Sequence, residues 1–124
     1  MMAGMASKGN VPDQSSSITL IDEGEFARLL RRSRASLDVA AKKHSIFFVD
    51  DRGERRYPSF FVDSSYRRRD LYLVSRTLGC LHGSSKLQFF THPKGSLGGD
   101  TPLEALRRGR RAEVLRSAVG FAER

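Results

Sequence analysis

Two segments with helical periodicity open the patterned part of the chain. Asp22 and Glu25 form a start similar to a capping box, which predicts a helix over residues 22–31. Ser33 is placed to cap a second helix that runs to His44. In the first segment Phe26, Leu29 and Leu30 fall at helical spacing, and in the second Leu37, Ala40 and Ala41 are the inward-facing positions. The pattern therefore predicts two short helices joined by a tight turn.

The periodicity changes after this pair, where β-branched and aromatic residues predominate. The runs 46–49 and 55–57 flank the glycine-containing segment 50–54, an arrangement typical of a β-hairpin. Pro58 has no backbone N–H, so it limits the second strand to an edge position or ends its pairing. We expect the apolar residues 59–63 to continue as an extended segment.

The second half of the chain returns to helical spacing. Its predicted helices span residues 69–81, a short segment from Ser84 or Ser85 to the His92-Pro93 step, residues 102–109 and residues 110–122. The predicted fold class is mainly α with a small β-hairpin (α+β), a helix-turn-helix and hairpin followed by a C-terminal helical bundle. The expected core residues are Phe47, Tyr57, Phe60, Leu71, Val74, Leu78, Leu103, Leu106, Leu115 and Val119.

Length and composition favour one core with a tail. The chain has 124 residues, of which 39% are hydrophobic, and this suits a single hydrophobic core. Residues 1–17 contain almost nothing apolar after the methionines, so we expect a disordered tail. The remainder divides into a helix-turn-helix-like module with a hairpin, 18–63, and a helical region, 64–124. Because no apolar run approaches the roughly 20 residues of a membrane span and no secretory signal opens the chain, we expect a cytoplasmic protein without a membrane partner.

The formal net charge is +8, and most of the excess lies in the second half. Residues 18–62 carry nine Lys or Arg against seven Asp or Glu, a net of +2, whereas residues 63–124 carry twelve against six, a net of +6. A basic balance is typical of proteins that bind nucleic acid, but a run of charge is as often a solvated helix face. The charge alone leaves both interpretations open.

The first module has the element order of a known DNA-binding fold. Helix, turn, helix and hairpin resemble a winged or MerR-like helix-turn-helix module, in which the segment from Ser33 to His44 would be the recognition element. The candidate DNA contacts are Arg34, Ser36, Lys42, Lys43, Arg55 and Arg56. Asp50 and Asp51 at the hairpin tip would repel a duplex. The alternative is that the module serves only dimerisation or scaffolding.

A constrained phrase near the C-terminus carries a second resemblance. In the segment 97–106, L-G-G-D-T-P-L-E-A-L, Thr101 can cap a helix, Pro102 suits its first position and Glu104 can reach back to the cap. This phrase resembles the C-terminal toxin-binding domain of Xre/MbcA/ParS-type antitoxins. The phrase Y-P-S-F-F-V-D at residues 57–63 is similar to one that precedes the toxin-binding helices in this group.

The resemblance implies a non-enzymatic protein that binds and neutralises a cognate toxin of the RES-domain type, a class associated with NAD depletion, and that binds DNA for autoregulation. A dense guanidinium cluster can form bidentate pairs with carboxylates, so four arginines are the leading partner contacts. These are Arg107, Arg108, Arg110 and Arg111. The alternatives are a DNA-binding transcription regulator without a toxin partner and a structural protein; we also expect a homo-oligomer.

The sequence offers little support for catalysis or for a cofactor, and we expect no catalytic, cofactor or metal site. Cys80 forms only a C-x-H pair with His82, and its apolar flanks predict a buried, inert thiol. Gly98 and Gly99 precede a helix but follow no strand, so a tight turn explains them better than a phosphate loop.

Overall fold

Helices account for most of residues 19–123, the part of the chain that the computed structural model describes. The described α-helices are α2 (Glu23–Leu30), α3 (Arg34–Lys42), α4 (Arg68–Leu78), α5 (Gly83–Thr91), α6 (Pro102–Arg107) and α7 (Arg111–Ala122), with 3₁₀ turns η2 (Ser59–Val62) and η3 (Gly95–Leu97). The strands are β2 (Leu20–Asp22), β3 (Val49–Asp51) and β4 (Glu54–Pro58). The predicted class, mainly α with a small β-hairpin, is confirmed. The predicted tail, 1–17, lies outside the described residues.

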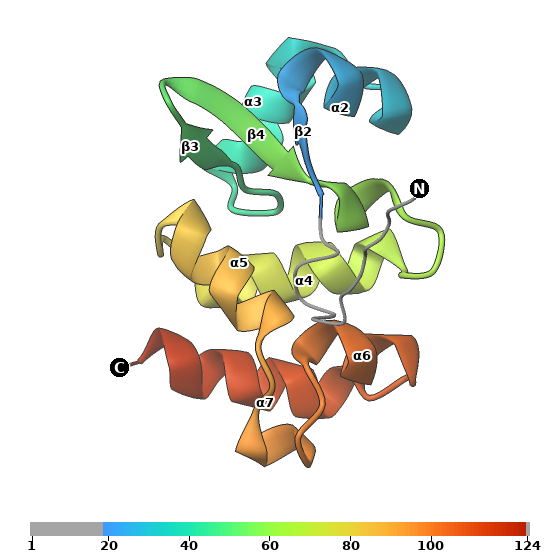
Figure 1. Cartoon of the computed structure of the whole chain (residues 1–124), viewed down its shortest axis with the longest axis vertical. Helices are drawn as coiled ribbons and strands as arrows, with labels where there is room; N and C mark the ends of the chain where they lie inside the picture. The colour runs from blue at the N-terminus through green and yellow to red at the C-terminus, as the bar shows by residue number, and fades with distance from the viewer. Residues whose placement is uncertain (1–18, 124) are drawn as a thin grey trace, which may run out of the picture.

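The elements are arranged in three levels along the long axis of the molecule (Figure 1). The sheet with α2 and α3 occupies one end, α4 and α5 lie in the middle, and α6 and α7 occupy the other end. The closest helix pair is α4 with α7, which joins the middle level to the C-terminal one. No described helix is long and apolar enough to cross a membrane.

The sheet differs from the predicted hairpin in two respects. Its strand order is β2-β4-β3, all antiparallel, so a third strand was missed and β4 is central. Pro58 is the last residue of β4, so the strand ends there, as one of the two predicted alternatives states; the next N–H, that of Ser59, donates to the carbonyl of Thr19 at 2.8 Å. The turn also shrinks to Arg52 and Gly53, whose φ angles of 58° and 85° match a tight two-residue hairpin turn.

Two apolar segments take different backbone conformations from those predicted. In the run 46–49 only Val49 lies in a strand, because Ile46 and Phe47 are buried in the core instead. The extended conformation predicted for residues 59–63 is wrong for Ser59–Val62, which form the 3₁₀ turn η2, whereas Asp63 is extended. Consecutive side chains of a strand point to opposite faces, whereas this turn buries both Phe60 and Phe61.

The helix boundaries follow local signals. Asp22 caps α2 by accepting the N–H of Glu25 at 2.8 Å, and Ser33 caps α3 by accepting that of Ser36 at 3.0 Å. Helix α4 ends at Leu78, three residues before the predicted end, because Gly79 adopts a φ of 68°. The remaining predicted helices are present as α5, α6 and α7.

The capping box of α6 has the predicted form. The Thr101 hydroxyl accepts the N–H of Glu104 at 3.1 Å, and the Glu104 carboxylate accepts the N–H of Thr101 at 2.9 Å. Pro102 occupies the first helical position. These contacts fix where α6 begins and hence where the α6–α7 junction lies.

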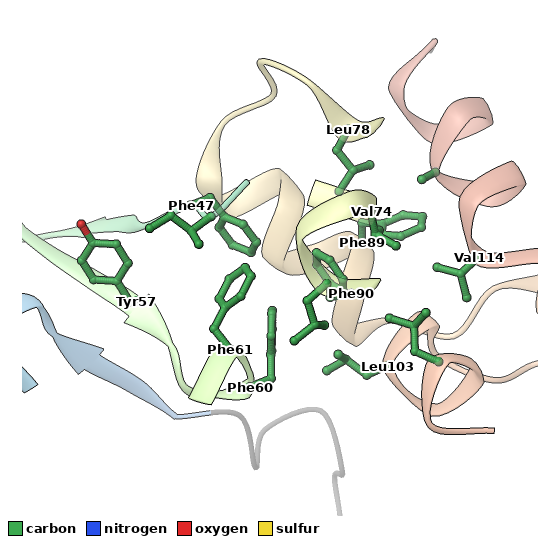
Figure 2. Packing of buried hydrophobic residues seen from close by; sticks show 14 of the residues in the cluster. Phe47, Tyr57, Phe60, Phe61, Val74, Leu78, Phe89, Phe90, Leu103 and Val114 are labelled. Atoms are coloured by element: carbon green, nitrogen blue, oxygen red, sulfur yellow. The ribbon is translucent and has the colours of Figure 1, made fainter. Parts of the chain in front are cut away.

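Aromatic rings join the sheet side of the core to the helices. Figure 2 shows Phe47, Phe60 and Phe90 side by side, with ring centroids 5.0 to 6.2 Å apart. The core cluster continues through α4 into α7, where Val114 is fully buried. One set of packed side chains therefore includes residues on both sides of position 63.

Most of the predicted core is buried, with two exceptions on α7. The confirmed residues are Phe47, Tyr57, Phe60, Leu71, Val74, Leu78, Leu103 and Leu106. Leu115 is only partly buried, and the prediction for Val119 is wrong because this side chain is 46% exposed. The core-facing residues of α7 are Val114 and Ala118, and the next position along a helix turns about 100° away from its neighbour.

Candidate binding surface at the α6–α7 junction

Two of the four candidate arginines are engaged in contacts that brace the junction. Arg110 donates to the Asp100 carboxylate at 3.0 Å, to the carbonyl of Leu97 at 3.2 Å and to Glu113. The hydrogen bond between Arg110 and Glu113 raises the pKa of the guanidinium and lowers the pKa of the carboxyl group. Arg108 reaches the same Asp100 carboxylate at 3.3 Å. The geometry gives these two side chains a role within the fold.

Arg111 is tied to the neighbouring helix. Its guanidinium lies 3.2 Å from Oδ1 of Asp70, a carboxylate buried in the first turn of α4. The side chain of Arg111 remains half exposed, whereas that of Asp70 is only 12% exposed. The arginine therefore neutralises a buried charge and still presents donors to solvent.

Arg107 differs from the other three because its charge is not neutralised within residues 19–123. Its guanidinium donates to the Tyr66 hydroxyl at 2.8 Å and lies 5.2 Å from the centroid of that ring. No carboxylate of the described residues forms an ion pair with it. The same holds for three exposed arginines at the start of α4, namely Arg67, Arg68 and Arg69.

Arg67, Arg107 and Arg111 line a concave region that we call the arginine hollow. It has a volume of about 520 Å³ and lies between the start of α4 and the α6–α7 junction. Its lining is Ser65, Arg67, Asp70, Leu106, Arg107, Gly109, Arg111 and Ala112. The structure thus brings two of the four candidate arginines together with Arg67, which the sequence analysis did not single out.

Next to the arginine hollow, α7 presents a second apolar stripe in addition to its core face. Ala112, Leu115, Val119 and Ala122 recur at spacings of three and four residues, so they share one side of the helix. Val119 is 46% exposed, and Leu115 is partly buried. We call this set the α7 outer stripe.

The hairpin arginines among the DNA candidates are engaged on the sheet. Arg55 lies 3.0 Å from the Asp38 carboxylate, and its guanidinium stacks 4.4 Å from the ring centroid of Phe48. Arg56 lies 2.9 Å from Glu54 and 3.7 Å from Asp51. Both charges are therefore already matched by carboxylates of the described residues.

The remaining DNA candidates lie on or next to α3. Arg34, Lys42 and Lys43 are exposed and form no ion pair with a described carboxylate. Ser36 and Lys43 line a groove of about 330 Å³. The full lining is Arg32, Ser36, Val39, Ala40, Lys43, Ser45, Tyr72 and Arg76. The lining carries three cations, Arg32, Lys43 and Arg76, and no carboxylate. Arg76 comes from α4, so its place beside α3 was not visible in the sequence.

Three features were considered for a reactive thiol, a metal site or a phosphate loop: Cys80, the His, Cys, Asp and Glu side chains, and the Gly98-Gly99 pair. Cys80 is exposed, so the prediction of a buried thiol is wrong; the early end of α4 leaves it in a turn. Among residues 19–123, no group of three His, Cys, Asp or Glu side chains is placed to hold a metal ion. The N–H groups of Gly98 and Gly99 bond to the carbonyls of Gly95 and Lys94, as expected for a tight turn.

One buried cation was missed. Lys86 in α5 is only 2% exposed, lies 5.9 Å from the ring centroid of Phe47, and has its pKa lowered to about 8 by burial. It precedes Phe89 and Phe90 by three and four residues, and both are fully buried. This helical spacing could have placed Lys86 on the core face of the helix.

Comparisons of this chain with protein families, with curated proteins and with solved structures found no match.

Proposed function

We propose that this chain is a non-enzymatic cytoplasmic protein that binds and blocks a partner protein, as an antitoxin does, through α7 and the α6–α7 junction. The observation that carries the proposal is the exposure of Val119 in the α7 outer stripe. A stable protein interface usually has an apolar centre with charged groups at its rim. The stripe would supply such a centre. Arg107 lines the arginine hollow together with Ala112 of the stripe, and it would supply a charge that no carboxylate of residues 19–123 neutralises.

The resemblance of the 97–106 phrase to the toxin-binding domain of Xre/MbcA/ParS-type antitoxins supports a RES-type toxin as the partner. The contacts among the arginines refine which ones would act. Arg108 and Arg110 are held by Asp100, so we assign them to the shape of the surface. Arg107 is the guanidinium that we place in contact with the partner, where it would pair with a carboxylate.

The test uses the full chain, because the core cluster includes residues before and after position 63. The chain is expressed with a RES-type toxin from its source genome, and growth and co-purification are scored. Val119→Asp places a charge in the centre of the proposed interface and should abolish both rescue and co-purification. Val39→Asp is the matched control, since this valine is 52% exposed on α3.

Equal rescue by the parent and by Val119→Asp would remove the α7 outer stripe from the interface. Loss of rescue in both valine variants would show a general effect of the new charge. Failure of the parent chain itself to rescue growth would contradict the antitoxin proposal and favour the second candidate.

The second candidate is a DNA-binding regulator, favoured by the groove between α3 and α4. Its three cations and its hydroxyl groups suit phosphate contacts, which depend steeply on salt. Reversing the charge of Lys42 and Lys43 should abolish binding to a duplex. If binding survives this change and disappears when Arg107 is neutralised, the C-terminal surface is the nucleic-acid site.

A further inference from the structure

The arginine hollow has a lining suited to a small anion. Its lining includes three arginines, Arg67, Arg107 and Arg111, and among residues 19–123 its only carboxylate is that of Asp70. Three positive charges and one negative charge leave a net of +2 in the lining. A volume of about 520 Å³ lies within the range of small-molecule sites, so the hollow admits more than a single ion.

Two of the three guanidinium groups are oriented before any ligand arrives. Arg107 is held by the hydroxyl and the ring of Tyr66, and Arg111 is held by Asp70. A guanidinium has five N–H donors, and each of these contacts occupies one of them. The remaining donors are therefore available at fixed positions, which lowers the entropic cost of binding.

The start of α4 lies beside the hollow and combines an uncapped helix N-terminus with a run of positive side chains. Helix α4 has eleven residues, and no side chain caps its N-terminus. The N–H groups of Arg68 and Arg69 have no acceptor among residues 19–123. Positive side chains at this end oppose the helix dipole, so helix stability does not explain the run from Arg67 to Arg69. Of this run, Arg67 lines the hollow, where a bound anion would neutralise its guanidinium charge together with that of Arg107.

We propose that the arginine hollow binds a phosphate group carried by a small molecule. A phosphate monoester has a charge close to −2 and three terminal oxygens, which match the net charge and the guanidinium groups of the lining. The site does not depend on the proposed toxin. Arg107 would belong to both surfaces, so an occupied hollow would compete with the partner for this side chain.

The test measures binding to the full chain by isothermal titration calorimetry at constant ionic strength. The probes are inorganic phosphate, pyrophosphate and adenosine 5′-monophosphate, with succinate as a dicarboxylate of the same charge. Phosphate should bind saturably and more tightly than succinate. Tighter binding of the nucleotide than of phosphate would show that the hollow also contacts the group that carries the phosphate; equal affinity would assign the site to the phosphate alone.

The variants Arg67→Gln and Arg107→Gln should each weaken phosphate binding about tenfold or more, as expected when a charge-assisted hydrogen bond is lost. Arg116→Gln is the matched control, because this exposed arginine of α7 lines neither the hollow nor the groove between α3 and α4. Thermal melts of all three variants establish that they remain folded.

Three outcomes would overturn the proposal. One is the absence of saturable phosphate binding by the parent chain. Another is an equal loss in Arg116→Gln, which would indicate diffuse attraction to the basic protein. The third is succinate binding as tightly as phosphate, which would identify a carboxylate site of the kind that the proposed toxin interface requires. Rescue from the toxin is scored separately, so either proposal can fail alone.

Discussion

The guanidinium of Arg111 lies 3.2 Å from the Oδ1 atom of Asp70, and this pair joins the first turns of α7 and α4. The carboxylate is 12% exposed, so it has little water to stabilise its charge. The two helices form the most extensive helix contact among residues 19–123, and the ion pair lies at its arginine-rich end. The same guanidinium thus supports the fold and lines the candidate site.

We predict that Arg111→Ala lowers the free energy of unfolding by about 1–3 kcal/mol, because it leaves the buried carboxylate of Asp70 without its partner. Arg69→Ala is the control in the same turn of α4. It removes an exposed cation from a helix N-terminus, so we expect no loss or a gain of roughly 0.3–1 kcal/mol. Urea denaturation of both variants measures the difference, and equal stabilities would show that the ion pair contributes nothing.

Gly83 is predicted to tolerate no side chain. A Cβ atom at this position would lie 1.8 Å from the carbonyl oxygen of Phe48, a backbone atom that no rotamer change can move. Gly83→Ala should therefore cost about 2 kcal/mol or more, since overpacking forces the backbone to shift. Gly120→Ala is the matched control on α7, where a Cβ meets nothing within 4 Å, and helix propensity predicts a gain of roughly 0.5–1 kcal/mol. Thermal melts in which Gly83→Ala is as stable as the parent would contradict the close approach of α5 to the chain before β3.

The difference in burial between two leucines predicts that the same substitution costs much more free energy of unfolding at one than at the other. Leu78 in α4 is 1% exposed, so Leu78→Ala should cost roughly 2–5 kcal/mol through lost contacts and a cavity. Leu29 in α2 is 39% exposed, and Leu29→Ala should cost less than about 1 kcal/mol. Denaturant midpoints at unchanged slope measure both values. A similar cost at both positions would contradict the assignment of α4 to the core.

Structural features that depend on residues close in sequence, such as helix caps, were predictable. The caps at Asp22 and Thr101 bond to N–H groups three residues later, so the sequence shows donor and acceptor together. Strand β2 gave no such signal: it has three residues, and its partners lie on β4, far along the chain. The central position of β4 was missed with it, because β4 pairs with β2 on one side and with β3 on the other.

The candidate site was predictable as a group of residues but not as an arrangement of charges. The four arginines of the α6–α7 junction are adjacent in sequence, so their density was visible. Their partners were not, because Asp70 precedes Arg111 by 41 residues and Arg67 enters the hollow from α4. Periodicity also misplaced Val119, since α7 carries apolar residues on two sides and the pattern does not show which side meets the core.

Because of Lys86, the free energy of unfolding should change with pH in the alkaline range. Burial lowers the pKa of its ammonium group to about 8 in the folded protein, whereas the unfolded value is 10.5. Between these two values the unfolded chain binds the proton and the folded chain does not, so the free energy of unfolding rises as the pH increases. Below pH 8 the destabilisation is complete, and above 10.5 it is absent. The difference of about 2.5 pKa units corresponds to about 3 kcal/mol.

Lys86→Met isolates this contribution, because it keeps the length of the side chain and removes the charge. We expect the variant to be more stable than the parent at pH 7 by about 1–3 kcal/mol, with the advantage vanishing as the pH approaches 10.5. Tyr57 also titrates at high pH, since burial raises its pKa to about 12, but this effect is common to both proteins and cancels in the difference. Lys43→Met, at an exposed position, is the control for the exchange of a lysine for a methionine. Urea denaturation of the three proteins between pH 7 and pH 10.5 measures the curves, and parallel curves for the parent and Lys86→Met would show that the ammonium group reaches solvent in the folded protein.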